Sequence, residues 1–168
     1  MKKALLVQTV RRALCTLLLV ALAGCASAPP PPVTETLSQA NALQALGFEK
    51  TNDGYVLNLP GPLLFDTGSD VLSQGAVARL AKLAEDLRVI KIERLRLFGH
   101  TDNIGSADFN RALSTRRAEA VAQAIASNGF AQDKLERRGF GFDRPLASND
   151  SADGRAKNRR VAVIVPFE

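Results

Sequence analysis

Residues 94–129 read RLRLFGHTDNIGSADFNRALSTRRAEAVAQAIASNG, a strand pattern followed by a polar loop and a long helical pattern. The strand is predicted over Arg94–Phe98. The helix is predicted from about Ala107 to Ser127, because Asn128-Gly129 is a typical helix stop signal. A strand that leads through a loop into a long helix is a unit of a fold that mixes helices with a sheet.

The flanking sequence repeats this alternation on both sides. The first long helix of the chain is predicted from the N-cap Ser73 to Leu87, with one apolar face. That face consists of Val77, Leu80, Leu83, Ala84 and Leu87. Further strands are predicted at Tyr55–Leu59, Lys134–Arg138 and Val161–Val165. Strands that alternate with helices indicate an α/β (α+β) fold of two layers.

An extension of residues 37–54 precedes the first of these strands. Leu37–Leu46 is predicted as a short helix that ends at Gly47. Asn52-Asp53-Gly54 is a turn signal between two extended runs, so a β-hairpin is expected here.

The N-terminal segment has the pattern of a secretory signal peptide over residues 1–24. A basic region is followed by the apolar run Ala13–Ala23, which is shorter than the about 20 residues of a membrane span. The run ends in Leu22-Ala23-Gly24-Cys25, which resembles the lipobox of bacterial lipoproteins. We therefore expect Cys25 to be acylated, in preference to a buried thiol or a disulfide partner. Ala26 after the cysteine predicts sorting to the outer membrane.

The chain of 168 residues has a formal net charge of +5, which at first indicates a basic protein. Residues 1–24 carry four positive charges and no negative ones, so their removal lowers the net charge to +1. This loss weakens the case for a nucleic-acid partner, and none is expected. Cys15 leaves with the signal and Cys25 carries lipid, so no disulfide is expected.

Residues 25–36 are predicted to tether the folded part to the membrane. They include Pro29-Pro30-Pro31-Pro32, which favours an extended polyproline conformation. At about 3.1 Å per residue, the tether reaches roughly 30 to 40 Å from the bilayer surface.

Arg117 is the residue of the second long helix that points most clearly to a function. It falls on the apolar arc of that helix, as does Asn110 two turns earlier. The arc is defined by Phe109, Leu113, Ala120, Val121 and Ala124. A guanidinium on an apolar face is costly unless it has an anionic partner or its head reaches water. The anion can be a ligand, and the alternatives are an internal salt bridge or an arginine whose head stays in water. Asp102 in the preceding loop is placed to face Arg117, giving an acid for an ammonium group and a base for a carboxylate.

The order of these and later residues resembles the OmpA-like C-terminal domain, which also occurs in peptidoglycan-associated lipoproteins and flagellar stator proteins. The match covers about residues 55–167 and defines a domain at 55–168. Its motifs are Phe65-Asp66-Thr67-Gly68-Ser69, Gly99-His100-Thr101-Asp102, Asn110, Leu113-Ser114, Arg117-Ala118, Gly139, Gly141, Pro145, Asn149, Gly154-Arg155 and Asn158-Arg159-Arg160-Val161. The resemblance implies a mixed four-stranded sheet with two long helices on one face, in the order βαβαββ.

The resemblance also implies a ligand, the diaminopimelate of the peptidoglycan stem peptide. By alignment Asp102 takes its ammonium group and Arg117 its carboxylate, which suits the bidentate geometry of arginine. Supporting contacts are expected from Asp66, Asn110 and Arg159, and Leu113 is expected to line the pocket. Ile104 departs from the family, where a polar residue is common, and this change is expected to weaken binding modestly.

No catalytic role, metal or cofactor is expected. His100 is the only histidine, and pairing with Asp102 would make it a base or a metal ligand. The sequence offers no second histidine and no remaining thiol to complete a metal site, and no activated nucleophile is evident. A structural role is therefore preferred for His100. Ser114 is expected to serve the helix. A basic cluster is formed by Arg155, Lys157, Arg159 and Arg160. A phosphate contact is one interpretation, but we expect these side chains to lie in solvent at the start of the last strand, with one of them contacting the ligand.

Together these inferences predict an outer-membrane lipoprotein that binds peptidoglycan noncovalently and links the membrane to the wall. An alternative is a wall-sensing lipoprotein that regulates another envelope protein, with residues 34–48 as its contact surface. A third alternative, a wall hydrolase, predicts release of soluble muropeptides, and we expect none.

Overall fold

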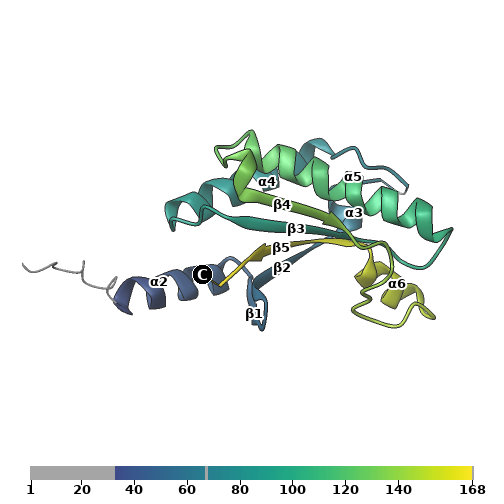
Figure 1. Cartoon of the computed structure of the whole chain (residues 1–168), viewed down its shortest axis with the longest axis horizontal. Coiled ribbons are helices and arrows are strands. Elements are labelled where there is room, and N and C mark those ends of the chain that lie inside the picture. The colour runs from purple at the N-terminus through teal and green to yellow at the C-terminus, as the bar shows by residue number, and fades with distance from the viewer. Residues whose placement is uncertain (1–32, 67, 168) are drawn as a thin grey trace, which may run out of the picture. The chain divides into compact units, whose positions relative to one another are not determined.

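The computed structural model describes residues 33–66 and 68–167 (Figure 1). The predicted signal peptide, the lipidation site Cys25 and the proline run of the tether lie outside the described residues. Within the described residues, no helix is both long and apolar enough to cross a membrane.

A mixed sheet of five strands forms one layer, with the strand order β1-β2-β5-β3-β4. The strands are β1 Glu49–Thr51, β2 Gly54–Pro60, β3 Leu95–His100, β4 Leu135–Gly139 and β5 Arg160–Val165. β3 and β4 are parallel, and the other neighbours are antiparallel. A parallel pair needs a long crossover connection, and the second long helix supplies it.

The helices are α2 Val33–Ala45, α3 Gly61–Leu64, α4 Gln74–Val89, α5 Ala107–Ala126 and α6 Ala152–Asn158, with a 3₁₀ turn at Gln132–Lys134. In Figure 1, α4 and α5 lie along the same face of the sheet. The residues Ser73, Ser106 and Ser151 cap α4, α5 and α6. Each serine side chain accepts a hydrogen bond from the backbone N–H three residues later.

The core lies between the sheet and these two helices. β3 contributes Leu95 and Leu97, and β5 contributes Val161 and Val163, all fully buried. The residues alternate along each strand, so that one face of the sheet meets the helices. Buried residues of the helices complete this cluster, among them Leu80, Leu87, Val121 and Ile125. The predicted two-layer fold with two long helices on one face is confirmed.

Several details differ from the sequence prediction. The sheet has five strands and not four, because the short β1 pairs with β2 across the hairpin turn. α2 begins at Val33, four residues before the predicted start. α3 and α6 were not predicted, since both are short and contain glycine or proline. Val77 and Phe109 were assigned to buried faces but are 44% and 51% exposed, because each lies in the first turn of its helix.

Two glycines bring α5 close to the sheet. Gly99 and Gly139 are partners in the parallel ladder of β3 and β4. A Cβ atom on Gly99 would lie 2.0 Å from the carbonyl oxygen of Ser114, and one on Gly139 would lie 2.3 Å from Thr115 Oγ1. The absence of these Cβ atoms lets the helix rest on the carboxyl ends of both strands. The N-terminal half of α5 is thereby held beside the loop that follows β3.

Candidate functional site

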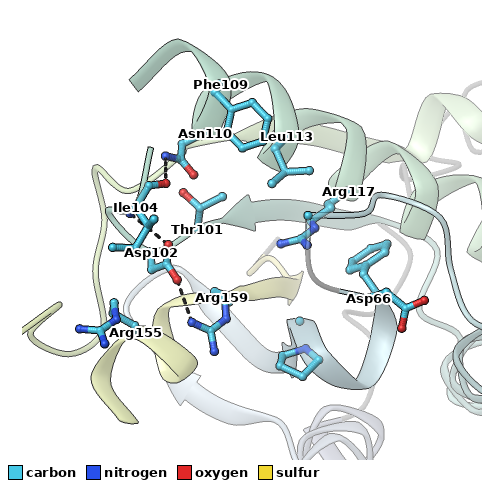
Figure 2. A pocket seen from close by; sticks show the side chains of 14 residues that line it. Asp66, Thr101, Asp102, Ile104, Phe109, Asn110, Leu113, Arg117, Arg155 and Arg159 are labelled. Atoms are coloured by element: carbon cyan, nitrogen blue, oxygen red, sulfur yellow. Dashed lines mark hydrogen bonds and ion pairs between the residues drawn. The ribbon is translucent and has the colours of Figure 1, made fainter. Parts of the chain in front are cut away.

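A pocket of about 580 Å³ lies where this loop and α5 meet the segment around α3 and the chain that enters β5. Its lining includes all six residues predicted from the sequence, namely Asp66, Asp102, Asn110, Leu113, Arg117 and Arg159 (Figure 2). The structure thus gathers residues that are up to 93 positions apart into one cavity. The carboxyl end of a sheet strand is a common position for ligand sites in such folds.

The loop after β3 is held by hydrogen bonds of its own residues. Asp102 Oδ1 accepts a hydrogen bond from the backbone N–H of Ile104 at 3.1 Å. Asn110 Nδ2 donates to the carbonyl oxygens of Ile104 and Ser106, at 2.8 and 3.1 Å. Both amide hydrogens of Asn110 are therefore used to shape the loop, and its side-chain oxygen is the atom that remains for a guest.

Asp102 also pairs with Arg159, a contact that the sequence did not predict. Arg159 Nη1 donates to Asp102 Oδ2 at 2.7 Å (Figure 2). The side chain of Asp102 is 13% exposed and that of Arg159 is 35% exposed. The acid is thus partly neutralised, but each of its oxygens retains a lone pair for a second donor.

Arg117 is buried, at 5% exposure, without an ion pair to any described residue. Its Nε donates to the carbonyl oxygen of Ser69 at 2.9 Å, and its guanidinium lies over the ring of Phe65, 5.0 Å from the centroid. Burial lowers the pKa of Arg117 from its usual value, although the charges of Asp70 and Asp102 oppose this effect. No internal salt bridge to a described residue accounts for this arginine, and little of it reaches the surface outside the pocket. Its two terminal nitrogens make no hydrogen bond to described residues.

Asp66 is placed less favourably than predicted. Its side chain is exposed, and Figure 2 shows its carboxylate directed away from Asp102 and Arg117. Asp66 therefore lies at the rim of the pocket, and a contact to a small guest would need the side chain to turn.

Apolar side chains form part of the wall on the side of α5 and the loop. Leu113 is 5% exposed, as expected for a residue that packs beneath the pocket. Phe109 and Ile104 also line the pocket but are 51% and 65% exposed. Sequence reasoning placed Phe109 in the core, because its helical spacing does not show that the first turn of α5 faces a cavity.

Thr101 and Arg155 complete the polar lining. Arg155 Nη1 donates to the carbonyl oxygens of Asn149 and Asp150, at 2.8 and 3.1 Å, so much of its role is to hold the loop before α6. Three arginines and two aspartates thus line the pocket, which suits a guest that carries both charges with an excess of negative charge.

His100 lies outside the pocket. Side chains alternate along β3, so His100 and Gly99 point to different faces of the sheet. On its own face His100 stacks on Phe140, with ring centroids 5.4 Å apart. Burial, with a smaller effect from the charges of Arg160 and Arg144, lowers the pKa of His100 to about 3. So weak a base does not suit proton transfer near neutral pH.

Ser114 has a structural role. Its hydroxyl donates to the carbonyl oxygen of Arg111 and accepts from the backbone N–H of Gly141, each at 2.9 Å. It thereby joins α5 to the loop after β4. Among the described residues, no group of three or more histidine, cysteine or acidic side chains is placed to hold a metal ion.

Known proteins share both the sequence and the fold. The chain is 39% identical to the outer-membrane lipoprotein YfiB of Pseudomonas aeruginosa over 151 residues, which cover 90% of this chain and 89% of the relative. The structure of the cell wall anchor of the type VI secretion system of P. aeruginosa matches with a TM-score of 0.64 and 32% identity, over 77% of this chain and 94% of that one.

The peptidoglycan-associated lipoprotein of Burkholderia pseudomallei matches with a TM-score of 0.54 and 28% identity, over 61% of this chain and 86% of that one. The family model described as "OmpA family" matches residues 64–159, a range that contains all six predicted ligand-binding residues. The resemblance found in the sequence motifs is therefore confirmed, and this chain belongs to the OmpA family.

Proposed function

We propose that this protein is an outer-membrane lipoprotein that binds peptidoglycan noncovalently, through the diaminopimelate of the stem peptide. Its pocket holds the free end of that residue, and the lipid on Cys25 holds the chain to the membrane. The protein catalyses no reaction and needs no cofactor in this role. The names of its relatives, an outer-membrane lipoprotein and wall-associated proteins, support the proposal.

The observation that carries the proposal is the state of Arg117. A buried guanidinium without an ion pair is unfavourable unless an anion completes it. Its terminal nitrogens are available for a bidentate carboxylate, while Asp102 in the same pocket accepts from an ammonium group. A guest with both groups on one carbon atom matches this pair of opposite charges.

Co-sedimentation with purified sacculi tests the proposal. The protein used is residues 26–168, which contains every described element. We expect the wild type to pellet with sacculi, and Asp102→Ala and Arg117→Ala to remain in solution. Arg116→Ala is the matched control. Arg116 directly precedes Arg117 in α5, but it pairs with Asp70, and neither residue lines the pocket. Equal pelleting of all four proteins would contradict the proposed site.

A second candidate function is regulation of another envelope protein in response to wall binding. The observation that favours it is the N-terminal extension, which lies outside the range of the family model but packs on the domain. Leu43 and Phe48 are buried, and Gln39 Nε2 donates to the carbonyl oxygen of Ile90 at 2.8 Å. The strand β1 forms an exposed sheet edge, which is open to pairing with a partner.

Affinity capture from envelope extracts tests this second candidate. We expect a specific partner to be captured by the wild type and lost when Lys50→Pro removes a hydrogen-bond donor from the β1 edge. Capture that is unchanged by Lys50→Pro, or no specific capture at all, would favour a simple anchor.

A further inference from the structure

Thr101 carries a buried hydroxyl group that no described residue satisfies. The residue is 3% exposed, it lines the pocket, and its Oγ1 has no hydrogen-bond partner. Its backbone is held in place, because its N–H donates to the carbonyl oxygen of Gly141 at 2.9 Å. Buried hydroxyl groups are almost always hydrogen-bonded, so an unpaired one in a pocket wall indicates a group that a guest completes.

Asp102 and Asn110, which also line the pocket, offer further acceptor atoms. The Asn110 amide uses its nitrogen for Ile104 and Ser106, and its oxygen accepts no hydrogen bond from described residues. The Asp102 carboxylate accepts one hydrogen bond at each oxygen and has capacity for more. Figure 2 shows Thr101 and Asn110 on the same side of the pocket as Asp102, with Arg117 further along α5.

A primary ammonium group has three N–H donors and no acceptor. The three acceptors on this wall match that number, whereas the terminal nitrogens of Arg117 can only donate. Thr101 therefore lies at the end of the pocket that suits the positive group of a zwitterionic guest.

We propose that Thr101 Oγ1 is the third acceptor of an ammonium subsite formed with Asp102 and Asn110. The hydroxyl makes the pocket selective for a primary over a secondary or tertiary ammonium group, because each added alkyl group leaves one of the three acceptors without a donor. This inference rests on the proposed function and adds a specificity-determining residue to it.

Thr101→Val tests the inference, since valine has the same shape and lacks only the hydroxyl. The ligand is a synthetic stem tripeptide that ends in diaminopimelate, and its affinity is measured by calorimetry. We expect Thr101→Val to bind about 10-fold more weakly, as is typical for the loss of a hydrogen bond to a charged group. Thr101→Ser keeps the hydroxyl and should bind like the wild type. Thr115→Val is the matched control for binding, because Thr115 does not line the pocket and its hydroxyl donates to the carbonyl oxygen of Arg111.

Thermal unfolding separates binding from a structural role. Removal of an unsatisfied hydroxyl should leave the Tm of the free protein unchanged or raise it. A Tm that falls together with the affinity would overturn the inference, because the hydroxyl would then be part of the fold.

A second ligand identifies the group that Thr101 contacts. Mono-N-methylation of the free amine keeps its charge but removes one donor. We expect the wild type to lose affinity for this ligand, and Thr101→Val to discriminate several-fold less between the two ligands. Steric effects of the methyl group are common to both proteins, because valine and threonine have the same shape. Equal discrimination by both proteins would overturn the ammonium assignment.

The outcomes also distinguish this inference from the proposed function. If the wild type does not bind the tripeptide, the proposed function fails and this inference fails with it. If the wild type binds, Arg117→Ala does not, and Thr101→Val binds like the wild type, only this inference fails.

Discussion

Arg117 and Asp102 carry opposite charges in the same pocket, but their surroundings differ. Arg117 is buried without an anionic partner, whereas Asp102 already pairs with Arg159. A guest carboxylate therefore meets a cation that is already largely desolvated, and a guest ammonium must share Asp102 with an arginine. We infer that both residues are needed for binding, that Arg117 contributes more to affinity, and that Asp102 also selects for a positive group.

His100 leads to a prediction about stability. Its pKa is lowered to about 3 in the folded protein, against 6.5 for the ordinary side chain. Between these two values the unfolded chain binds more protons, so stability must fall as the pH falls through this window. The loss from this residue amounts to about 2 kcal/mol between pH 7 and pH 5.

Urea unfolding at the two pH values measures this effect. The variant His100→Phe retains a ring against Phe140 but cannot take up a proton, so its stability should depend less on pH by about 2 kcal/mol. The acidic side chains are present in both proteins, so their contribution cancels in the comparison. Identical pH dependence in the two proteins would contradict the burial of a neutral histidine.

At the scale of elements, the position of α5 decides whether the pocket exists. The helix supplies Asn110, Leu113 and Arg117, and the loop before it supplies Thr101 and Asp102. The backbone of α5 approaches β3 and β4 at the two glycines of the ladder, and its N-cap Ser106 fixes the point where the loop ends. Any change that lifts the helix from the strands therefore also separates Arg117 from the loop.

Gly99→Ala is expected to show this coupling. The added Cβ would lie 2.0 Å from a backbone oxygen of α5, which cannot move without the helix. We expect the free energy of unfolding to fall by about 3 kcal/mol, together with loss of binding to sacculi. Urea unfolding provides the measurement.

Gly75→Ala is the matched control for this substitution. Gly75 lies in the first turn of α4, and a Cβ there meets no atom within 4 Å. The same change should be neutral or slightly stabilising, because alanine has the higher helix propensity. If Gly99→Ala were as stable as Gly75→Ala, the close packing of α5 on β3 would be wrong.

At the scale of the whole molecule, the proposed function needs two separate attachments. One is the pocket in the folded domain, and the other is the lipid expected on Cys25, which lies outside the described residues. An extended tether between them would let each attachment act without the other.

Fractionation of cells tests this independence. Cys25→Ser should lose metabolic labelling with palmitate and leave the membrane fraction, while its purified domain still binds sacculi. Arg117→Ala should keep the label and stay in the membrane fraction, but should no longer co-purify with peptidoglycan. Membrane retention of Cys25→Ser would show that the predicted lipid anchor is wrong.

The sequence by itself determined the local structure and the family. The strand and helix periods, the serine caps and the glycine stops act within a few residues, so α4, α5, β3 and β5 were predicted close to their observed bounds. The ordered motifs also identified six residues that line one pocket. This was possible because the family resemblance implies where the motif residues lie in the fold.

Only the tertiary structure decided how these residues are paired. The antiparallel register places His100 opposite Arg160, so Arg159 lies beside Thr101 and can reach Asp102. No local pattern encodes this contact, because it joins residues 57 positions apart through the alignment of two strands. For the same reason the unsatisfied hydroxyl of Thr101 was not predicted: the absence of a partner depends on every segment that packs around the group, and sequence spacing describes only one segment at a time.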